Sequence, residues 1–172
     1  RGLVVINHMH QRGRMLGADV FEEISKQVPL DLVGMGTKEY GGLGEILHPQ
    51  LPAFISRYRF FFNPIRYTSF GLAVCEAMMA GMPVVTLATT EYATVFQDGV
   101  NGFAHTNIDY LAGRMKQLLH DQSLAISIGL QGKKTAETKF SMERFTSQWK
   151  QVFQLAINNN KITHEEANSI YQ

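Results

Sequence analysis

Residues 58–85 constrain the fold of this chain most, because three apolar runs follow one another there with short joints: YRFFFNPIRYTSFGLAVCEAMMAGMPVV. Residues 58–62 are aromatic and apolar without alternation, as in a strand that is covered on both faces. Residues 72–80 are apolar nearly all round, which predicts a core helix, and Ser69 can cap its start. Gly81 and Pro83 end this helix before a second strand begins at residue 84. Strand, helix and strand in this order are typical of a parallel crossover unit.

Two features of this unit concern ligand binding. The start of the predicted helix presents free N–H groups and the positive end of the helix dipole, which suits phosphate, and Gly71 lets a ligand approach the backbone closely. Glu76 is the one charged residue of the helix and lies on the same face as Ser69, two turns further on. A carboxylate in such an apolar helix requires hydrogen-bond partners. Hydroxyl groups of a ligand could supply them, and so could a neighbouring backbone amide or arginine.

The spacing of this segment resembles the donor-site signature of the GT-B glycosyltransferases, and more narrowly the large retaining family called glycosyl transferases group 1. The matching residues are Pro64-x-x-x-Thr68-x-Phe70-Gly71-Leu72-x-x-x-Glu76-Ala77-Met78-x-x-Gly81-x-Pro83-Val84-Val85. The resemblance implies that Glu76 binds the ribose hydroxyls of a nucleotide, and that the amides around Phe70, Gly71 and Leu72 hold its diphosphate. The family's first glutamate contacts the donor sugar, and Thr68 stands at its position in this chain. Whether this chain still carries out donor chemistry therefore stays open.

The first strand, loop and helix of the resembled family carry an Arg and a Lys that neutralise the donor diphosphate. Gly17 and Asp19 fit that pattern, but Leu16 stands in the position of the Lys. Arg12 or Arg14 could substitute for it, because a guanidinium binds phosphate in a bidentate way. The alternative is that both are solvated loop arginines.

Two further parts of the sequence bear on the site. The family's later glycine pair is replaced by Thr90-Glu91, and the glutamate that follows it by Thr94. His8 and His10 lack the nearby carboxylates or thiols of a metal site. We therefore expect no metal and no cofactor.

The composition is that of one globular domain. The 172 residues are 45% hydrophobic and 18% charged, which excludes a disordered chain. A net charge of +1 gives no indication of a nucleic-acid-binding surface. Apolar runs are too short for a transmembrane segment and no signal peptide is recognised, so we expect a cytoplasmic protein, or a membrane-peripheral one as part of the full-length protein. Because the sequence begins with Arg1 and runs straight into a strand, we expect a fragment of a longer protein.

Residues 1–157 are predicted to form a nucleotide-sugar-binding domain, a Rossmann-like α/β fold with a parallel sheet flanked by helices and a helical C-terminal end. A polar tail is predicted at 158–172, and a loop at 9–17. Beyond the crossover unit, the apolar periodicity and the turn residues predict further strands and helices. The strands are predicted at 2–8, 30–35 and 102–105, and the helices at 18–27, 49–57, 91–96, after Asn107, at 123–139 and from Ser141.

The resemblance implies the donor-binding domain of a glycosyltransferase, hexosyl or related, that moves a sugar from a nucleotide diphosphate sugar to an unknown acceptor with retention. An N-terminal acceptor domain would be its partner and is absent from this chain, so we assign no catalytic residue. The alternative is a non-catalytic GT-B-like interaction module. Thr68, Leu16 and Thr94 favour that alternative, whereas Glu76 argues against it. A GT-B epimerase would need an acid–base constellation that we do not find.

Overall fold

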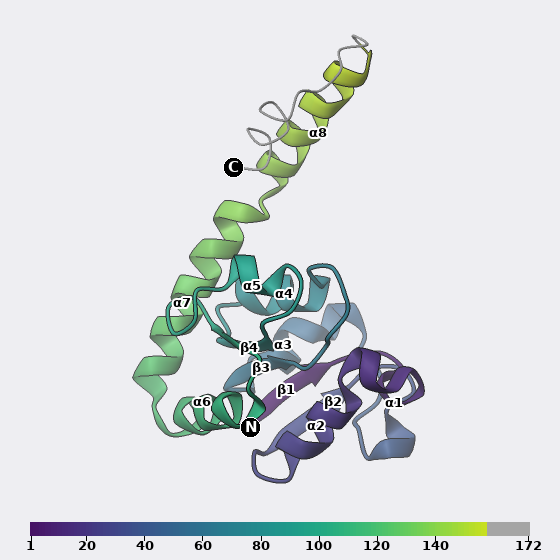
Figure 1. Cartoon of the computed structure of the whole chain (residues 1–172), viewed down its shortest axis with the longest axis vertical. Coiled ribbons are helices and arrows are strands. Elements are labelled where there is room, and N and C mark those ends of the chain that lie inside the picture. The colour runs from purple at the N-terminus through teal and green to yellow at the C-terminus, as the bar shows by residue number, and fades with distance from the viewer. Residues whose placement is uncertain (158–172) are drawn as a thin grey trace. The chain divides into compact units, whose positions relative to one another are not determined.

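The computed structural model describes residues 1–157, and the predicted tail at 158–172 lies outside the described residues. Five parallel strands form one sheet in the order β2-β1-β3-β4-β5 (Figure 1). The strands are β1 (Gly2–Val5), β2 (Leu30–Val33), β3 (Phe60–Asn63), β4 (Val84–Leu87) and β5 (Phe103–His105). The prediction of a Rossmann-like parallel sheet is therefore confirmed.

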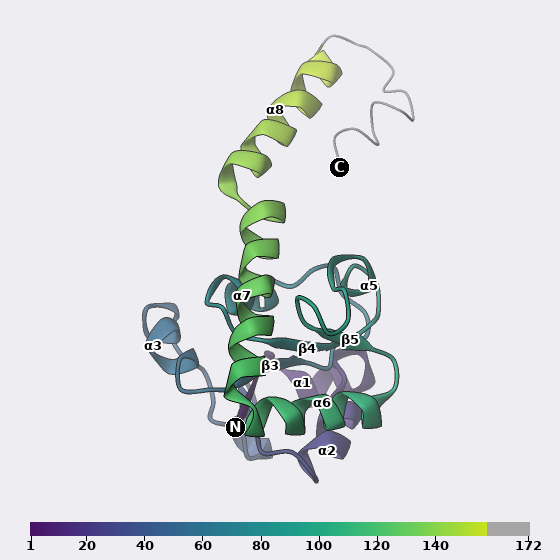
Figure 2. The ribbon, with the colours of Figure 1, turned by 90° about the vertical axis from the view of Figure 1, so that its left-hand side faces the viewer.

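Helices alternate with the strands along the chain and continue after the last strand. They are α1 (Met9–Arg12), α2 (Ala18–Ser25), α3 (Leu51–Ile55), α4 (Leu72–Met79), α5 (Tyr92–Val95), α6 (Ile108–His120), α7 (Gln122–Lys139) and α8 (Met142–Ile157), with 3-10 turns at Gly13–Leu16, Lys38–Tyr40 and His48–Gln50. Helices α2 and α6 cover one face of the sheet, and α4 and α5 cover the other (Figures 1 and 2).

The core explains why the β3 segment shows no alternation of apolar and polar residues. Phe60, Phe61 and Phe62 are all at most 3% exposed, because helices pack on both faces of this central strand. Phe60 and Phe62 belong to the larger apolar cluster, which also takes in Ile24 of α2 and Leu111 of α6. The strand therefore places its carboxyl end, and the loop that follows it, on a rigid base.

Three predictions of local structure are wrong. Residues 9–17 are not a loop: they form α1 and a 3-10 turn that begins at Gly13, where φ is positive (54°), and such short turns carry no apolar periodicity. Ser69 does not cap α4, since the cap position is Gly71 in an extended conformation. Helix α4 is also not apolar core on all sides, because Leu72 at its start is 82% exposed. The predicted left-handed stop at Gly81 is confirmed (φ 75°).

The chain divides into two compact units, residues 1–135 and 136–172. The described part of the second unit includes α8, in which the Ser141 hydroxyl accepts a hydrogen bond from the Arg144 N–H at 3.2 Å, as a capping residue does. Phe145, Trp149 and Phe153 stand about half exposed along this helix. The helical C-terminal end is confirmed, and the domain boundary at residue 157 stays a prediction. Among the described residues, no helix combines the length and the apolar character that a membrane span needs.

Candidate functional site

The strand order places a topological switch point at the carboxyl ends of β1 and β3, which we call the β1–β3 crevice. These two strands are neighbours, but the chain proceeds from β1 to β2 on one side and from β3 to β4 on the other. The loops that leave β1 and β3, residues 6–17 and 64–71, therefore lead to helices on opposite faces of the sheet, α2 and α4. Open α/β sheets bind their ligands in such a crevice. Both sequence segments that resemble a donor site lie on these two loops.

The two loops are in direct contact. A Cβ atom added to Gly17 would lie 2.0 Å from the carbonyl oxygen of Pro64, and Gly17 has φ 77°, so a side chain is excluded there on both counts. The Arg66 N–H also donates a hydrogen bond to the Met15 carbonyl at 3.2 Å. The glycine at position 17 thus has a steric basis, which is the close approach of the β1 loop to the β3 loop.

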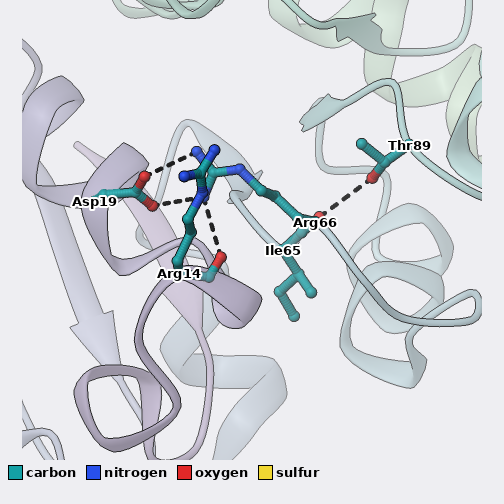
Figure 3. A network of polar contacts seen from close by, with 5 residues as sticks. All are labelled: Arg14, Asp19, Ile65, Arg66 and Thr89. Carbon is teal, nitrogen blue, oxygen red and sulfur yellow. Dashed lines mark hydrogen bonds and ion pairs between the residues drawn. The ribbon is translucent and has the colours of Figure 1, made fainter.

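Arg66 ties the same loops together through its side chain (Figure 3). Its guanidinium donates to both carboxylate oxygens of Asp19, at 2.5 and 3.0 Å, and to the Arg14 carbonyl at 3.0 Å. The Arg66 hydrogen bond lowers the pKa of Asp19 below its usual value. Sequence reasoning missed Arg66, because nothing local pairs it with an aspartate 47 residues earlier.

The start of α4 follows the β3 loop, and one of its backbone N–H groups is already hydrogen-bonded. The Gly71 N–H donates to the Tyr92 hydroxyl at 3.1 Å, and Tyr92 itself is fully buried. Within residues 1–157, the next two amides, Leu72 and Ala73, have no acceptor, as is usual in a first helical turn. The ring of Phe70 packs on Tyr92 at a centroid distance of 5.3 Å. An anion at this helix start would therefore meet Leu72 and Ala73 rather than Gly71.

Glu76 lies one turn into α4, at a small hollow between this helix, the sheet and α3. Ala73 of the first turn lines the same hollow, together with Val5 at the end of β1 and Phe61 of β3. Glu76 is partly exposed, so it is neither sealed in the core nor fully solvated. The structure thus brings Glu76 together with the start of α4 beside the β1–β3 crevice.

The remaining predicted residues lie around this crevice. Thr68 is partly buried, and its carbonyl oxygen accepts a hydrogen bond from the Thr90 hydroxyl at 2.7 Å. Arg12 and Arg14 are both exposed, and the Arg12 guanidinium lies 3.7 Å from the sulfur of Met15. Leu16, at the position where the resembled family has its Lys, is buried and 6% exposed. The structure leaves both interpretations of the arginines open.

His8 follows β1 and has an uncommon backbone conformation for a residue with a side chain (φ 54°). Its Nδ1 atom is buried and has no hydrogen-bond partner among the described residues. His10 stacks on Tyr40 at a centroid distance of 4.0 Å. In the described part of the chain, no three His, Cys, Asp or Glu side chains gather as metal ligands would.

Comparison with known proteins identifies the family of the chain. The family model described as Glycosyl transferases group 1 matches residues 3–121, which includes the β1 loop and the β3–α4 segment. The chain is 33% identical to O-antigen chain mannosyltransferase B of Escherichia coli over 122 residues, which are 68% of this chain and 31% of that protein.

Two solved structures show the same fold. A TarM variant of S. aureus in complex with Fondaparinux, alpha-GlcNAc-glycerol and UDP has a TM-score of 0.76 at 17% identity, over 88% of this chain and 35% of that one. Anabaena HepE in complex with UDP has a TM-score of 0.72 at 19% identity, over 89% of this chain and 48% of that one. This chain spans less than half the length of each of these relatives. Because the family model covers more than half of its residues, the chain belongs to the Glycosyl transferases group 1 family.

Proposed function

We propose that this chain is the donor-binding domain of a glycosyltransferase, hexosyl or related, which transfers a sugar from a nucleotide diphosphate sugar to an acceptor with retention. Family membership supports sugar transfer, and the UDP in the TarM and HepE complexes supports a nucleotide donor. The acceptor site would belong to another domain of a longer protein, because this chain spans only 31–48% of the length of these relatives. A cytoplasmic location is part of the same proposal.

The observation that carries this proposal is the meeting of the α4 start and Glu76 beside the β1–β3 crevice. The free N–H groups of Leu72 and Ala73, with the helix dipole behind them, suit the diphosphate. These groups would also stabilise the negative charge that grows on the diphosphate as the glycosidic bond breaks. Glu76, one turn on, would accept hydrogen bonds from the ribose hydroxyls.

The positive charge that assists the helix would come from Arg12 or Arg14. Arg66 is closer to the β3 loop, but the carboxylate of Asp19 already neutralises it. Both Arg12 and Arg14 are exposed and can turn toward a bound diphosphate. A guanidinium would bind two of its oxygens at once.

The second candidate function is a non-catalytic interaction module with the same fold. The buried Leu16 favours it, because no cation is available at that position. Thr68 favours it as well, because a threonine cannot supply the negative charge of the glutamate in the resembled signature.

Calorimetric titration with UDP, GDP and ADP tests the proposal. The wild-type chain is compared with Glu76→Gln, which removes the charge but keeps the size, and with Glu39→Gln as an exposed control on the β2 loop. We expect one nucleotide to bind, with about 10-fold or greater loss in Glu76→Gln, the usual effect of a hydrogen bond to a charged group. The control should bind like the wild type. No binding of any of the three at millimolar concentration would favour the interaction module.

A further inference from the structure

The β3–α4 loop, residues 64–71, is held from both sides. On the β1 side, Arg66 binds Asp19 and the Met15 carbonyl. On the β4 side, two consecutive threonines donate their hydroxyls to loop carbonyls: Thr89 to Ile65 at 3.4 Å, as Figure 3 shows, and Thr90 to Thr68 at 2.7 Å. The loop thus enters α4 with its backbone fixed by side chains from two neighbouring loops.

Thr90 makes its hydrogen bond from a strained backbone. Its φ is 47°, and among residues 1–157 the only other non-glycine residue with a positive φ is His8. A β-branched side chain is a genuine outlier in this region, whereas glycine, which the resembled family has at this position, adopts it freely. Such strain persists where the surroundings over-determine the conformation, and it gathers at functional sites. Both strained residues follow carboxyl ends of strands, at the edge of the sheet where the candidate site lies.

We propose that Thr90 is a positioning residue, which holds residues 64–71 over the start of α4 through the hydrogen bond from its hydroxyl to the Thr68 carbonyl. What it positions, the binding surface for a nucleotide sugar, rests on the function proposed above. The loop ends at Gly71, whose N–H is fixed in turn by the Tyr92 hydroxyl. A loop fixed at Ile65, Thr68 and Gly71 is ordered before the ligand arrives, so binding does not have to order it.

Two substitutions test the role of the Thr90 hydroxyl. Thr90→Gly removes the hydrogen bond and also relieves the strained φ, whereas Thr90→Ser keeps a hydroxyl that can reach Thr68. If this hydrogen bond only stabilises the fold, Thr90→Gly changes the thermal midpoint and leaves the affinity for the nucleotide as it is. If the hydroxyl positions the loop, Thr90→Gly speeds the exchange of the loop amides and also weakens nucleotide binding.

The experiment measures the order of the loop and the affinity for the ligand separately. Amide hydrogen exchange by NMR follows the two hydrogen-bonded loop amides, Arg66 and Gly71. Calorimetry follows the binding of UDP and UDP-glucose. For Thr90→Gly we expect about 3- to 10-fold faster exchange and a similar loss of affinity, the effect of one hydrogen bond. Thr90→Ser should stay within roughly twofold of the wild type in both measurements, because it keeps that bond.

Unchanged exchange in Thr90→Gly overturns the proposal, as does a Thr90→Ser variant that behaves like Thr90→Gly. Faster exchange with unaltered affinity refutes the positioning role and leaves the proposed function standing. If the wild-type chain binds no UDP, GDP or ADP, the proposed function fails instead. The exchange rates of Arg66 and Gly71 then still decide whether Thr90 holds the loop.

Discussion

The Arg66 guanidinium and the Asp19 carboxylate join the loops that leave two neighbouring strands, with Nη1–Oδ1 and Nη2–Oδ2 distances of 2.5 and 3.0 Å. This bidentate pair links α2 to the loop that follows β3 (Figure 3). Arg66, whose side chain is 20% exposed, therefore joins α2 to the β3 loop. Its charge is paired with Asp19 and is not free for a ligand.

Asp19→Asn should make the stability of the chain less dependent on pH. Arg66 lowers the pKa of Asp19 in the folded state, so the pair stabilises the fold above the ordinary pKa of 3.8 and loses this effect as the pH falls through the folded-state pKa. Because the Asp19 side chain is 51% exposed, we expect only about 0.5–1 kcal/mol at pH 7. Urea unfolding of both proteins at pH 7 and at low pH measures this difference. A difference between the two proteins that is as large at low pH as at pH 7 would contradict the account.

Gly17→Ala should be far more destabilising than Gly13→Ala. Both glycines have a positive φ, 77° and 54°, so both substitutions introduce backbone strain of roughly 1–3 kcal/mol. Only at Gly17 does the new Cβ also meet a backbone atom, the Pro64 carbonyl oxygen, at 2.0 Å, while at Gly13 nothing lies within 4 Å. The free energies of unfolding of the two variants measure the contact between the loops. Equal losses in both would show that the loops can separate freely.

Two helical glycines should respond to alanine with opposite signs. At Gly113 of α6 an added Cβ meets nothing within 4 Å, so Gly113→Ala should stabilise the chain by up to about 1 kcal/mol through helix propensity. At Gly129 of α7 the Cβ would lie 2.0 Å from the Gly81 carbonyl oxygen, so Gly129→Ala should destabilise it. The thermal unfolding midpoints of both variants measure these two changes in stability. Stabilisation by Gly129→Ala would mean that α7 does not pack against the turn after α4.

The crossover unit could be predicted from the sequence because its signals are local. Three apolar runs and the Gly81 stop act within a few residues, and the structure confirms both strands, helix α4 and the stop. Helix α4 still differs at its start, where Gly71 rather than Ser69 is the cap. Nothing in the residues near position 69 indicates that Tyr92 will bind the Gly71 amide.

The hydrogen bonds that hold the β3–α4 loop in place could not be predicted, because they join segments that are far apart in the chain. Arg66 and Asp19 are 47 residues apart, and Thr90 and Thr68 are 22 apart. Such pairs depend on the order of the strands and on the paths of the loops, and neither leaves a periodic pattern in the sequence. The roles of Glu76, Arg12 and Arg14 stay predictions.

The most direct test of the donor site is an NMR titration of the ¹⁵N-labelled chain with the nucleotide diphosphate that calorimetry selects. We predict that the amide resonances of Leu72 and Ala73 move most, because their N–H groups are the free donors at the start of α4. The resonances of Arg59 and Gly81, at the amino-terminal edge of the sheet, should stay in place. Shifts that gather at Arg59 and Gly81 while Leu72 and Ala73 do not move would contradict the account.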